Sequence, residues 1–283
     1  MVYVGLDIGG TKLMAAAASQ DGAILRRTRV ATPRGLDEGL ALLSELTREV
    51  AGDRPIGGIG AAIGGPLDWK TGVVSPLHQP EWREVPLGAR MSAEFGCRFS
   101  VDVDTNVAAL GEYASCDSKP QKLLYLTVST GMGGGFVIGG RLYRGLGGAH
   151  PEVAHQSVNY RASGTGRIEC ECGIPDCLEA LVSGNGIRRV YGVPAEELSD
   201  AQWSEVAYNL GQGLRNLATI YLPDEIVLGG GVAVGGGDAF LHEVTKVMTD
   251  HLALVPTPRV RLSSHGYDTA LIGALYIAQH GLV

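Results

Sequence analysis

Three cysteines and a histidine form a pattern that could hold a metal ion. Cys170, Cys172 and Cys177 fall within eight residues, and His155 comes fifteen residues before the first of them. Thiolate sulfurs and an imidazole nitrogen are the donors of a tetrahedral structural zinc site, and four protein ligands leave no open position for catalysis. An alternative is that the thiols are buried as small apolar side chains. Because acidic residues and a Gly-Ile-Pro turn make the segment polar, we expect zinc to fix it.

Two carboxylates flank this pattern. Glu152 precedes His155 by three residues, and Glu179 follows Cys177 by two. Zinc on the segment would bring both carboxylates near the imidazole. Such a group of hydrogen-bonding side chains suits a polyhydroxylated ligand.

The N-terminal segment could bind a phosphate. Residues 2–6, 13–18 and 24–30 are expected as strands, with Asp7 at the end of the first and Gly9-Gly10-Thr11-Lys12 in the turn after it. Turn glycines leave backbone N–H groups open to a phosphate, and a carboxylate beside a phosphate suggests magnesium. The same letters are equally typical of a hairpin turn, and the chain has neither a Walker loop nor a Gly-x-Gly-x-x-Gly pattern.

Two further glycine loops follow expected strands. Residues 123–128 run into a loop that contains Thr130, Gly131 and Gly133, before a strand at 136–138. This repeats the N-terminal order of strand, glycine loop with a threonine, and strand, which suggests an internally duplicated fold that grips a polyphosphate from both sides. A strand at 225–228 feeds Gly229–Gly231, where backbone could approach the sugar and base of a nucleotide.

Asp102 and Asp104 are candidates for general base chemistry. They share one face of an expected strand at 99–104, just before a helix at 106–113. Ligands of open α/β sheets bind at the carboxyl ends of strands, and neighbouring carboxylates raise each other's pKa. Alternatively, Asp104 or Thr105 caps the helix. Similarly, the glycines of Gly64-Gly65-Pro66 bring backbone close to either a ligand or a neighbouring helix.

Composition narrows the class of protein. The chain has 283 residues, 45% of them hydrophobic, and a net charge of -7, which disfavours a nucleic-acid partner. We expect no signal peptide and no membrane span, hence a cytoplasmic protein. In that reducing compartment, clustered cysteines favour metal over disulfides, and Cys97 and Cys116 are expected as packing residues. Strands alternate with helices, expected at 36–50, 183–191, 201–222 and 269–279, which indicates the α/β class.

Together these motifs resemble the ROK family of bacterial sugar kinases and sugar-responsive repressors. The resemblance rests on Asp7-x-Gly-Gly-Thr-Lys, Asp104-x-Asn106, Thr130-Gly-x-Gly, Glu152-x-x-His, Cys170-x-Cys-Gly-x3-Cys-x-Glu and Leu228-Gly-Gly-Gly, and it covers essentially the whole chain. It implies the actin-like ATPase (ribonuclease H-like) fold, with two domains and a cleft between them. We expect an N-terminal domain of residues 1–117 plus 269–283 and a C-terminal domain of residues 118–268 that carries the zinc segment.

The resemblance also implies a function, an ATP-dependent kinase that phosphorylates the 6-hydroxyl of a hexose such as glucose, with Asp104 as catalytic base. The sugar would be held by Gly65, Asp104, Glu152, His155 and Glu179. The transferred phosphate and Mg²⁺ would be held by Asp7, Gly9, Gly10, Thr11 and Lys12. The rest of ATP would be held by Thr130, Gly131, Gly133, Gly230 and Gly231. The structural zinc ligands would be His155, Cys170, Cys172 and Cys177. The expected partners are a small sugar and a second copy of the chain in a homodimer, with no nucleic acid and no membrane.

Some positions depart from the family. Val103 stands where the family usually has an asparagine that holds sugar hydroxyls, so the substrate is either glucose, used weakly, or a modified ligand such as an amino sugar or a C7-cyclitol. Ala154 and Asp176 replace customary glycines, and Arg161–Arg167 is expected as an extra loop. The pattern does not separate ATP from polyphosphate as donor. A non-catalytic, sugar-sensing regulator is disfavoured because Asp7 lies almost at the start, without a preceding helix-turn-helix, and because Asp7 and Asp104 are retained.

Overall fold

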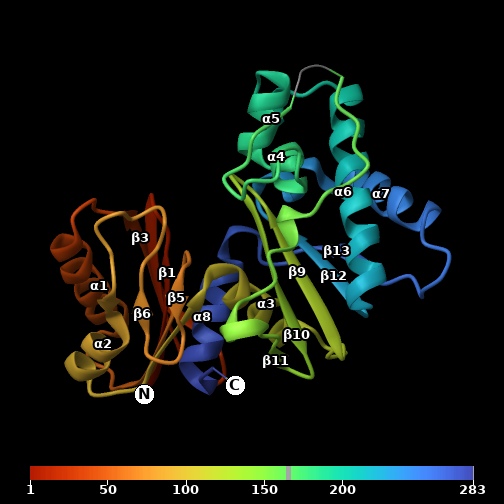
Figure 1. The fold of residues 1–283 in the computed structure, drawn as a ribbon. Helices are drawn as coiled ribbons and strands as arrows, with labels where there is room; N and C mark the ends of the chain where they lie inside the picture. The colour runs from red at the N-terminus through yellow and green to blue at the C-terminus, as the bar shows by residue number, and fades with distance from the viewer. Residues whose placement is uncertain (164–166, 283) are drawn as a thin grey trace. The chain divides into compact units, whose positions relative to one another are not determined.

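The computed structural model describes residues 1–163 and 167–282. The chain divides into two compact units, Met1–Ser115 with Asp268–Val283, and Cys116–Tyr267 (Figure 1). Each unit is built on a five-stranded sheet with helices packed against it. None of the described helices combines the length and the apolar character that crossing a membrane requires.

The sheet of the first unit has the strand order β3-β2-β1-β4-β8. Its strands are β1 (Val2–Ile8), β2 (Lys12–Ala18), β3 (Ile24–Ala31), β4 (Ile56–Ile63) and β8 (Phe99–Val103). The first three are antiparallel, whereas β4 and β8 run parallel to β1. The carboxyl ends of β1, β4 and β8 therefore meet at one edge, where Asp7, Gly65 and Asp104 lie.

Helices cover both faces of this sheet (Figure 1). On one face, α1 (Leu36–Ala51) contributes Leu40 and Leu43 to a core with β1 and β2. On the other, α8 (Thr269–His280) packs with α3 (Asp104–Ser115). The carbonyl oxygen of Ala274 lies so close to Gly60 that any side chain there would collide with it. The glycines of β4 thus let α8 approach the sheet. A further helix, α2 (Leu87–Phe95), and three short strands, β5 (Leu67–Asp68), β6 (Val73–Val74) and β7 (Val85–Pro86), complete the unit.

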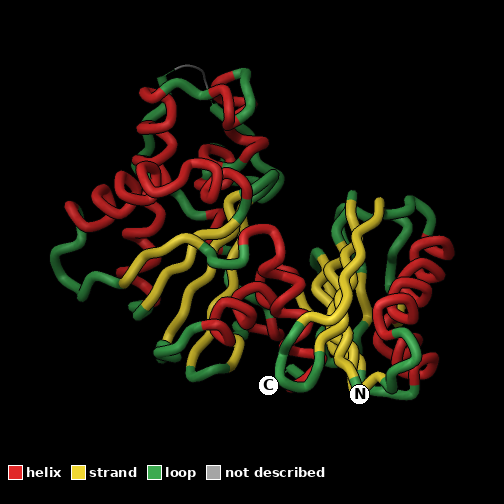
Figure 2. Tube along the Cα trace, turned by 180° about the vertical axis from the view of Figure 1, so that it is seen from behind, coloured by secondary structure: helices red, strands yellow, loops and turns green. Residues whose placement is uncertain are grey.

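The second unit is also built around a sheet (strands yellow in Figure 2). It repeats the arrangement of the first, with the strand order β11-β10-β9-β12-β13. Its strands are β9 (Lys122–Val128), β10 (Met132–Ile138), β11 (Arg141–Leu142), β12 (Glu225–Gly229) and β13 (Arg259–Leu262). In both sheets an antiparallel hairpin lies beside parallel strands. This common order agrees with the duplication inferred from the two glycine loops.

Four helices surround the core of the second unit. They are α4 (Leu178–Val182), α5 (Gly184–Tyr191), α6 (Asp200–Tyr221) and α7 (Gly231–Asp250). Leu178, Leu210 and Val244 meet the apolar face of β9 and β12 in one cluster. Short 3₁₀ turns occur at Leu146–Gly148, Val153–His155, Ala195–Glu197 and, in the stretch where the units join, Gly266–Asp268.

Two local expectations need correction. Strand β10 begins at Met132, so the second glycine loop is only Ser129–Gly131, and Gly133 pairs with Thr127 inside the sheet. Gly134 of β10 serves packing, because a Cβ there would lie 2.6 Å from a methyl group of Val153. Helix α3 begins at Asp104 rather than Asn106.

The two isolated cysteines have different surroundings. Cys97 packs against the core of the first unit as expected, but Cys116 accepts a hydrogen bond from Arg261 at 3.3 Å, so its surroundings are polar.

Within the expected extra loop, residues 164–166 lie outside the described residues. The described part packs on α6, since the guanidinium of Arg161 stacks 3.8 Å over the ring of Tyr208.

Candidate active-site residues and metal centre

Two carboxylates lie close together in the first unit. Asp7 is on β1, and Asp104 is the first residue of α3, directly after β8. The pKa of Asp7 is raised to about 7, mainly by burial and then by the negative charges of Asp104 and Asp268, while Arg29 opposes them. A bound Mg²⁺ would favour the charged carboxylate, because hard oxygen ligands are what that ion prefers. Neither Arg29 nor Asp268 was singled out from the sequence, since only the folded sheet brings them near Asp7.

Of the two aspartates at the end of β8, only Asp104 is exposed. Asp102 is buried, and its Oδ1 accepts hydrogen bonds from the N–H of Val103 at 2.7 Å and from Nδ2 of Asn106 at 3.0 Å. Asp102 therefore ties the strand end to the first turn of α3. Thr105 Oγ1 has no hydrogen-bond partner among the described residues, which excludes capping by Thr105. Asp104 is the aspartate of the pair that a ligand could reach.

The turn after β1 is held by a backbone hydrogen bond of its own and by the hydroxyl of Thr32. Gly9 donates its N–H to the carbonyl of Lys12 at 3.0 Å, and Thr32 donates to the carbonyl of Gly9 at 2.6 Å. This leaves Gly10, Thr11 and Lys12 exposed. His78, which the sequence did not single out, lies against the turn, since a Cβ at Gly10 would be 3.2 Å from that of His78.

Gly64 and Gly65 are not pressed against a helix. A Cβ at Gly64 would meet no described atom within 4 Å, and one at Gly65 would meet only Val103, at 3.6 Å. The carbonyl of Gly65 accepts a hydrogen bond from the N–H of Leu77 at 3.0 Å. These surroundings favour the ligand interpretation of Gly65 over the packing one, and they make Val103 the side chain beside it.

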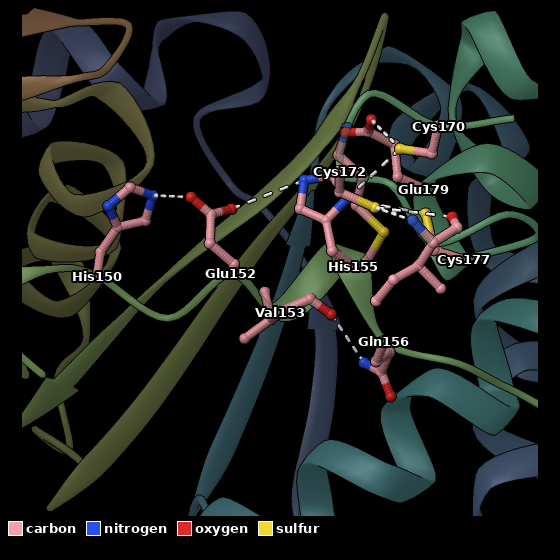
Figure 3. A network of polar contacts seen from close by, with 11 residues as sticks. His150, Glu152, Val153, His155, Gln156, Cys170, Cys172, Cys177 and Glu179 are labelled. Carbon is pink, nitrogen blue, oxygen red and sulfur yellow. Dashed lines mark hydrogen bonds and ion pairs between the residues drawn. The ribbon is translucent and has the colours of Figure 1, made fainter.

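The expected metal ligands of the second unit converge. One donor atom from each of His155, Cys170, Cys172 and Cys177 lies within 4.8 Å of the others (Figure 3). Nδ1 of His155 is 3.7 Å from the sulfur of Cys170 and 3.7 Å from that of Cys177. Zinc bond lengths and tetrahedral angles require separations of about 3.6 to 3.8 Å between such donors. The four residues therefore fit a zinc ion bound through Nδ1 and three sulfurs.

Backbone contacts hold the histidine segment beside the cysteine segment. Ser157 and Cys177 form an isolated antiparallel bridge, and Leu178 donates its N–H to the carbonyl of Gln156 at 2.9 Å. Burial raises the pKa of the Cys177 thiol to about 12 and also raises that of Cys170. Without a metal these thiols stay protonated at neutral pH, so zinc binding would release protons.

Asp176 organises the cysteine segment. Its φ of 55° lies in the left-handed region, which aspartate tolerates better than most residues. Its N–H donates to the carbonyl of Ile168 at 2.8 Å, its Oδ1 accepts from the N–H of Ile168 at 2.6 Å, and its Oδ2 accepts from the hydroxyl of Tyr160 at 3.2 Å. Asp176 thus keeps the backbone conformation of a glycine and adds two side-chain contacts.

The expected sugar ligands of the second unit lie at the metal cluster. Oε2 of Glu152 is 3.8 Å from Nε2 of His155, and Oε1 of Glu152 is 3.5 Å from Nε2 of His150 (Figure 3). On the other side, Oε1 of Glu179 is 3.7 Å from the sulfur of Cys170. His150 was missed because it lies outside the Glu152-x-x-His pattern. The structure brings Glu152, His155 and Glu179 around one cluster.

The third glycine segment joins β12 to α7. Gly230 has a φ of 86°, and a side chain there would collide with the carbonyl of Val128, so only glycine fits. A Cβ at Gly231 would be 2.9 Å from the hydroxyl of the exposed Tyr267, which the sequence did not single out. Gly230 and Gly231 are half-buried, and their lack of side chains makes room for Val128 and Tyr267.

Comparison with known proteins settles the family. The ROK family model matches residues 3–281. The chain belongs to the ROK family. A glucokinase from Halalkalibacterium halodurans is 29% identical, over 98% of this chain and 94% of that protein.

Two solved structures are similar along their whole length. The ROK hexokinase from Thermus thermophilus has a TM-score of 0.85 and 31% identity, with 98% of each chain covered. The ROK family glucokinase from Streptomyces griseus, solved with glucose and AMPPNP, has a TM-score of 0.80 and 26% identity, with 99% of this chain and 100% of that one covered. The expected family and the expected α/β, actin-like ATPase fold are confirmed.

The buried charge of Asp7 predicts a pH-dependent gain of stability in Asp7→Asn. A carboxyl whose folded pKa is raised stabilises the fold below its unfolded pKa of 3.8, and that contribution is lost as the pH rises through about 7. In magnesium-free buffer at pH 8, the free energy of unfolding of the variant should therefore exceed that of the wild type by on the order of 1 kcal/mol or more. One pKa unit corresponds to about 1.4 kcal/mol. The difference should shrink toward pH 4.

Urea unfolding at several pH values measures this difference. Asp21→Asn is the control, because hydrogen bonds with Ser19 lower the pKa of that exposed carboxyl and no gain should follow. A variant of Asp7 that is less stable than the wild type at pH 8 contradicts the assignment.

The contacts of Asp176 predict that Asp176→Gly weakens zinc binding. Glycine keeps the left-handed backbone but loses both side-chain contacts, each of which contributes about 1 kcal/mol, so the zinc dissociation constant should rise roughly thirtyfold. Asp176→Asn keeps one acceptor and should lose less. Competition with a chromophoric chelator measures both, with the exposed Glu171→Gln as control. Wild-type zinc affinity in Asp176→Gly rules out the organising role.

Proposed function

We propose that this chain transfers the γ-phosphoryl group of ATP to the 6-hydroxyl of a hexose, with glucose as the simplest substrate. The enzyme is an ATP-dependent sugar kinase of the ROK family, as its relatives indicate. The observation that carries the proposal is the exposed carboxylate of Asp104 at the carboxyl end of β8, close enough to Asp7 to raise the pKa of that carboxyl.

In the proposed reaction Asp104 is the general base. Its carboxylate accepts the proton of the sugar hydroxyl as the hydroxyl oxygen forms a bond to the γ-phosphorus. The bond from that phosphorus to the bridging oxygen of ADP breaks, and a sugar phosphate and ADP result. Asp102 holds the strand end through Val103 and Asn106, which keeps Asp104 oriented. Positioning and charge neutralisation supply most of the catalysis in phosphoryl transfer.

The remaining residues have roles in binding. Asp7, Gly10, Thr11 and Lys12 would face the transferred phosphate, and Asp7 would hold Mg²⁺, which neutralises phosphate charge when bound. Gly65, Glu152, His155 and Glu179 would hold the sugar hydroxyls. Thr130 and Gly131 would contact the nucleotide phosphates, and Gly230 and Gly231 the adenosine. Nε2 of His155, opposite the nitrogen that faces the sulfurs, is the nitrogen available to the sugar.

A modified sugar or cyclitol is the second candidate substrate, because of Val103. This side chain is the neighbour of Gly65 and cannot form a hydrogen bond. A buried sugar hydroxyl left without a partner there would cost about 1 to 3 kcal/mol. A ligand without a hydroxyl at that position avoids this cost.

Asp104→Asn tests the catalytic assignment. The amide cannot accept the proton, so kcat should fall by roughly 10² to 10⁴, while sugar binding, which needs only hydrogen bonds, should stay within about tenfold. Coupled ADP detection and calorimetric titration of sugar measure the two effects. Asp117→Asn, an exposed aspartate outside the assigned residues, is the control. Undiminished turnover in Asp104→Asn removes that residue from the role of base.

Val103→Asn tests substrate choice. If valine leaves a sugar hydroxyl unpaired, asparagine should raise kcat/KM for glucose about tenfold relative to the best wild-type substrate, which matches the cost of one hydrogen bond. Val103→Thr, which keeps the branched shape, controls for packing in the strand. No change in that ratio contradicts the specificity argument.

A further inference from the structure

The loop between β9 and β10 is held by the helices that follow the cysteine segment. Gly184 donates its N–H to the carbonyl of Ser129 at 2.7 Å, and Asn185 donates to the carbonyl of Thr130 at 3.0 Å. Both donors are in the first turn of α5. A Cβ at Gly184 would lie 3.1 Å from the same carbonyl oxygen of Ser129, so the close approach depends on glycine there.

The third contact to this loop is made by a side chain. Oε2 of Glu179, in the first turn of α4, accepts a hydrogen bond from the N–H of Met132 at 2.9 Å. The same oxygen would lie 3.2 Å from a Cβ at Gly131. The carboxylate therefore lies against the residues Gly131 and Met132, where the loop enters β10.

The other carboxylate oxygen of Glu179 faces the metal ligands. Oε1 is 3.7 Å from the sulfur of Cys170, and Cys177 comes two residues before Glu179, at the start of α4 (Figure 3). One side chain thus contacts both the cysteine cluster and the glycine loop. A hydroxyl of a bound sugar could still donate to either oxygen, because a carboxylate oxygen accepts more than one hydrogen bond.

We propose that Glu179 is a positioning residue for nucleotide binding, which links the zinc ligands to the loop Ser129–Gly131. The proposal rests on the proposed function, in which Thr130 and Gly131 contact the phosphates of ATP. Zinc fixes Cys170 and Cys177, these fix the start of α4, and Glu179 then holds the N–H of Met132 and the loop before it. Loss of the Glu179 side chain weakens nucleotide binding even when no sugar is present.

The test compares Glu179→Ala with Glu179→Gln in the zinc-loaded full-length chain. Calorimetric titration with magnesium AMPPNP, without sugar, gives the nucleotide dissociation constant. We expect Glu179→Ala to raise this dissociation constant at least fivefold. In Glu179→Gln it should stay within about twofold of the wild-type value, because the side-chain oxygen of glutamine can accept a hydrogen bond from the N–H of Met132. Glu171→Ala, in the same segment and exposed, is the control and should match wild type.

Hydrogen exchange at the Met132 amide gives a second measurement that does not depend on nucleotide. Exchange should be faster in Glu179→Ala than in wild type and Glu179→Gln. Bound zinc per chain and the melting temperature show whether each variant is folded. If Glu179→Ala is unfolded, the test uses the nucleotide dissociation constant and the Met132 exchange rate of Glu179→Ser, compared with those of Glu179→Gln.

The outcomes separate this proposal from the proposed function. Equal nucleotide affinity in wild type and Glu179→Ala, with sugar kinase turnover in wild type, overturns the positioning role alone. Absence of both nucleotide binding and turnover in wild type overturns the proposed function and this inference together.

Discussion

The convergence of one imidazole and three sulfurs orders much of the second unit. The segment from His150 to Cys177 contains no strand and only a single 3₁₀ turn among its described residues, so little regular hydrogen bonding holds it. Its shape comes from the donor cluster, from the bridge between Ser157 and Cys177, and from the contacts of Asp176. The exposed carboxylate of Glu152 and the loop before β10 both depend on that shape.

In the first unit, the fold holds carboxylates close together. Asp7 and Asp104 repel each other, and the fold tolerates this because Asp7 can take a proton in the absence of a cation. A bound Mg²⁺ would relieve this repulsion between the carboxylates. The same end of the sheet presents the backbone of Gly65 beside the side chain of Val103.

Much of this could be predicted where the signal is local. The strand ends at Asp7 and Asp104, the glycine turns and the cysteine spacing all follow from short stretches of sequence. The start of β10 could not be predicted in this way, because a glycine at position 134 is required by Val153, which lies in a different part of the chain. Arg29, Asp268 and His78 were missed for the same reason: only the folded sheet brings them to Asp7 and Gly10. Cys116 was assigned to packing because its partner Arg261 is 145 residues away.

Sugar-dependent release of ADP from magnesium ATP is the decisive measurement for the kinase reaction assigned to Asp104. It should cover glucose, mannose, N-acetylated and amino hexoses, and cyclitols, with the zinc-loaded wild type and Asp104→Asn side by side. If Asp104 is the base of a sugar kinase, the wild type turns over at least one member of this panel, the product carries phosphate on the former hydroxyl, and the variant loses that turnover. Absence of turnover with every member, or turnover that survives in Asp104→Asn, contradicts this assignment.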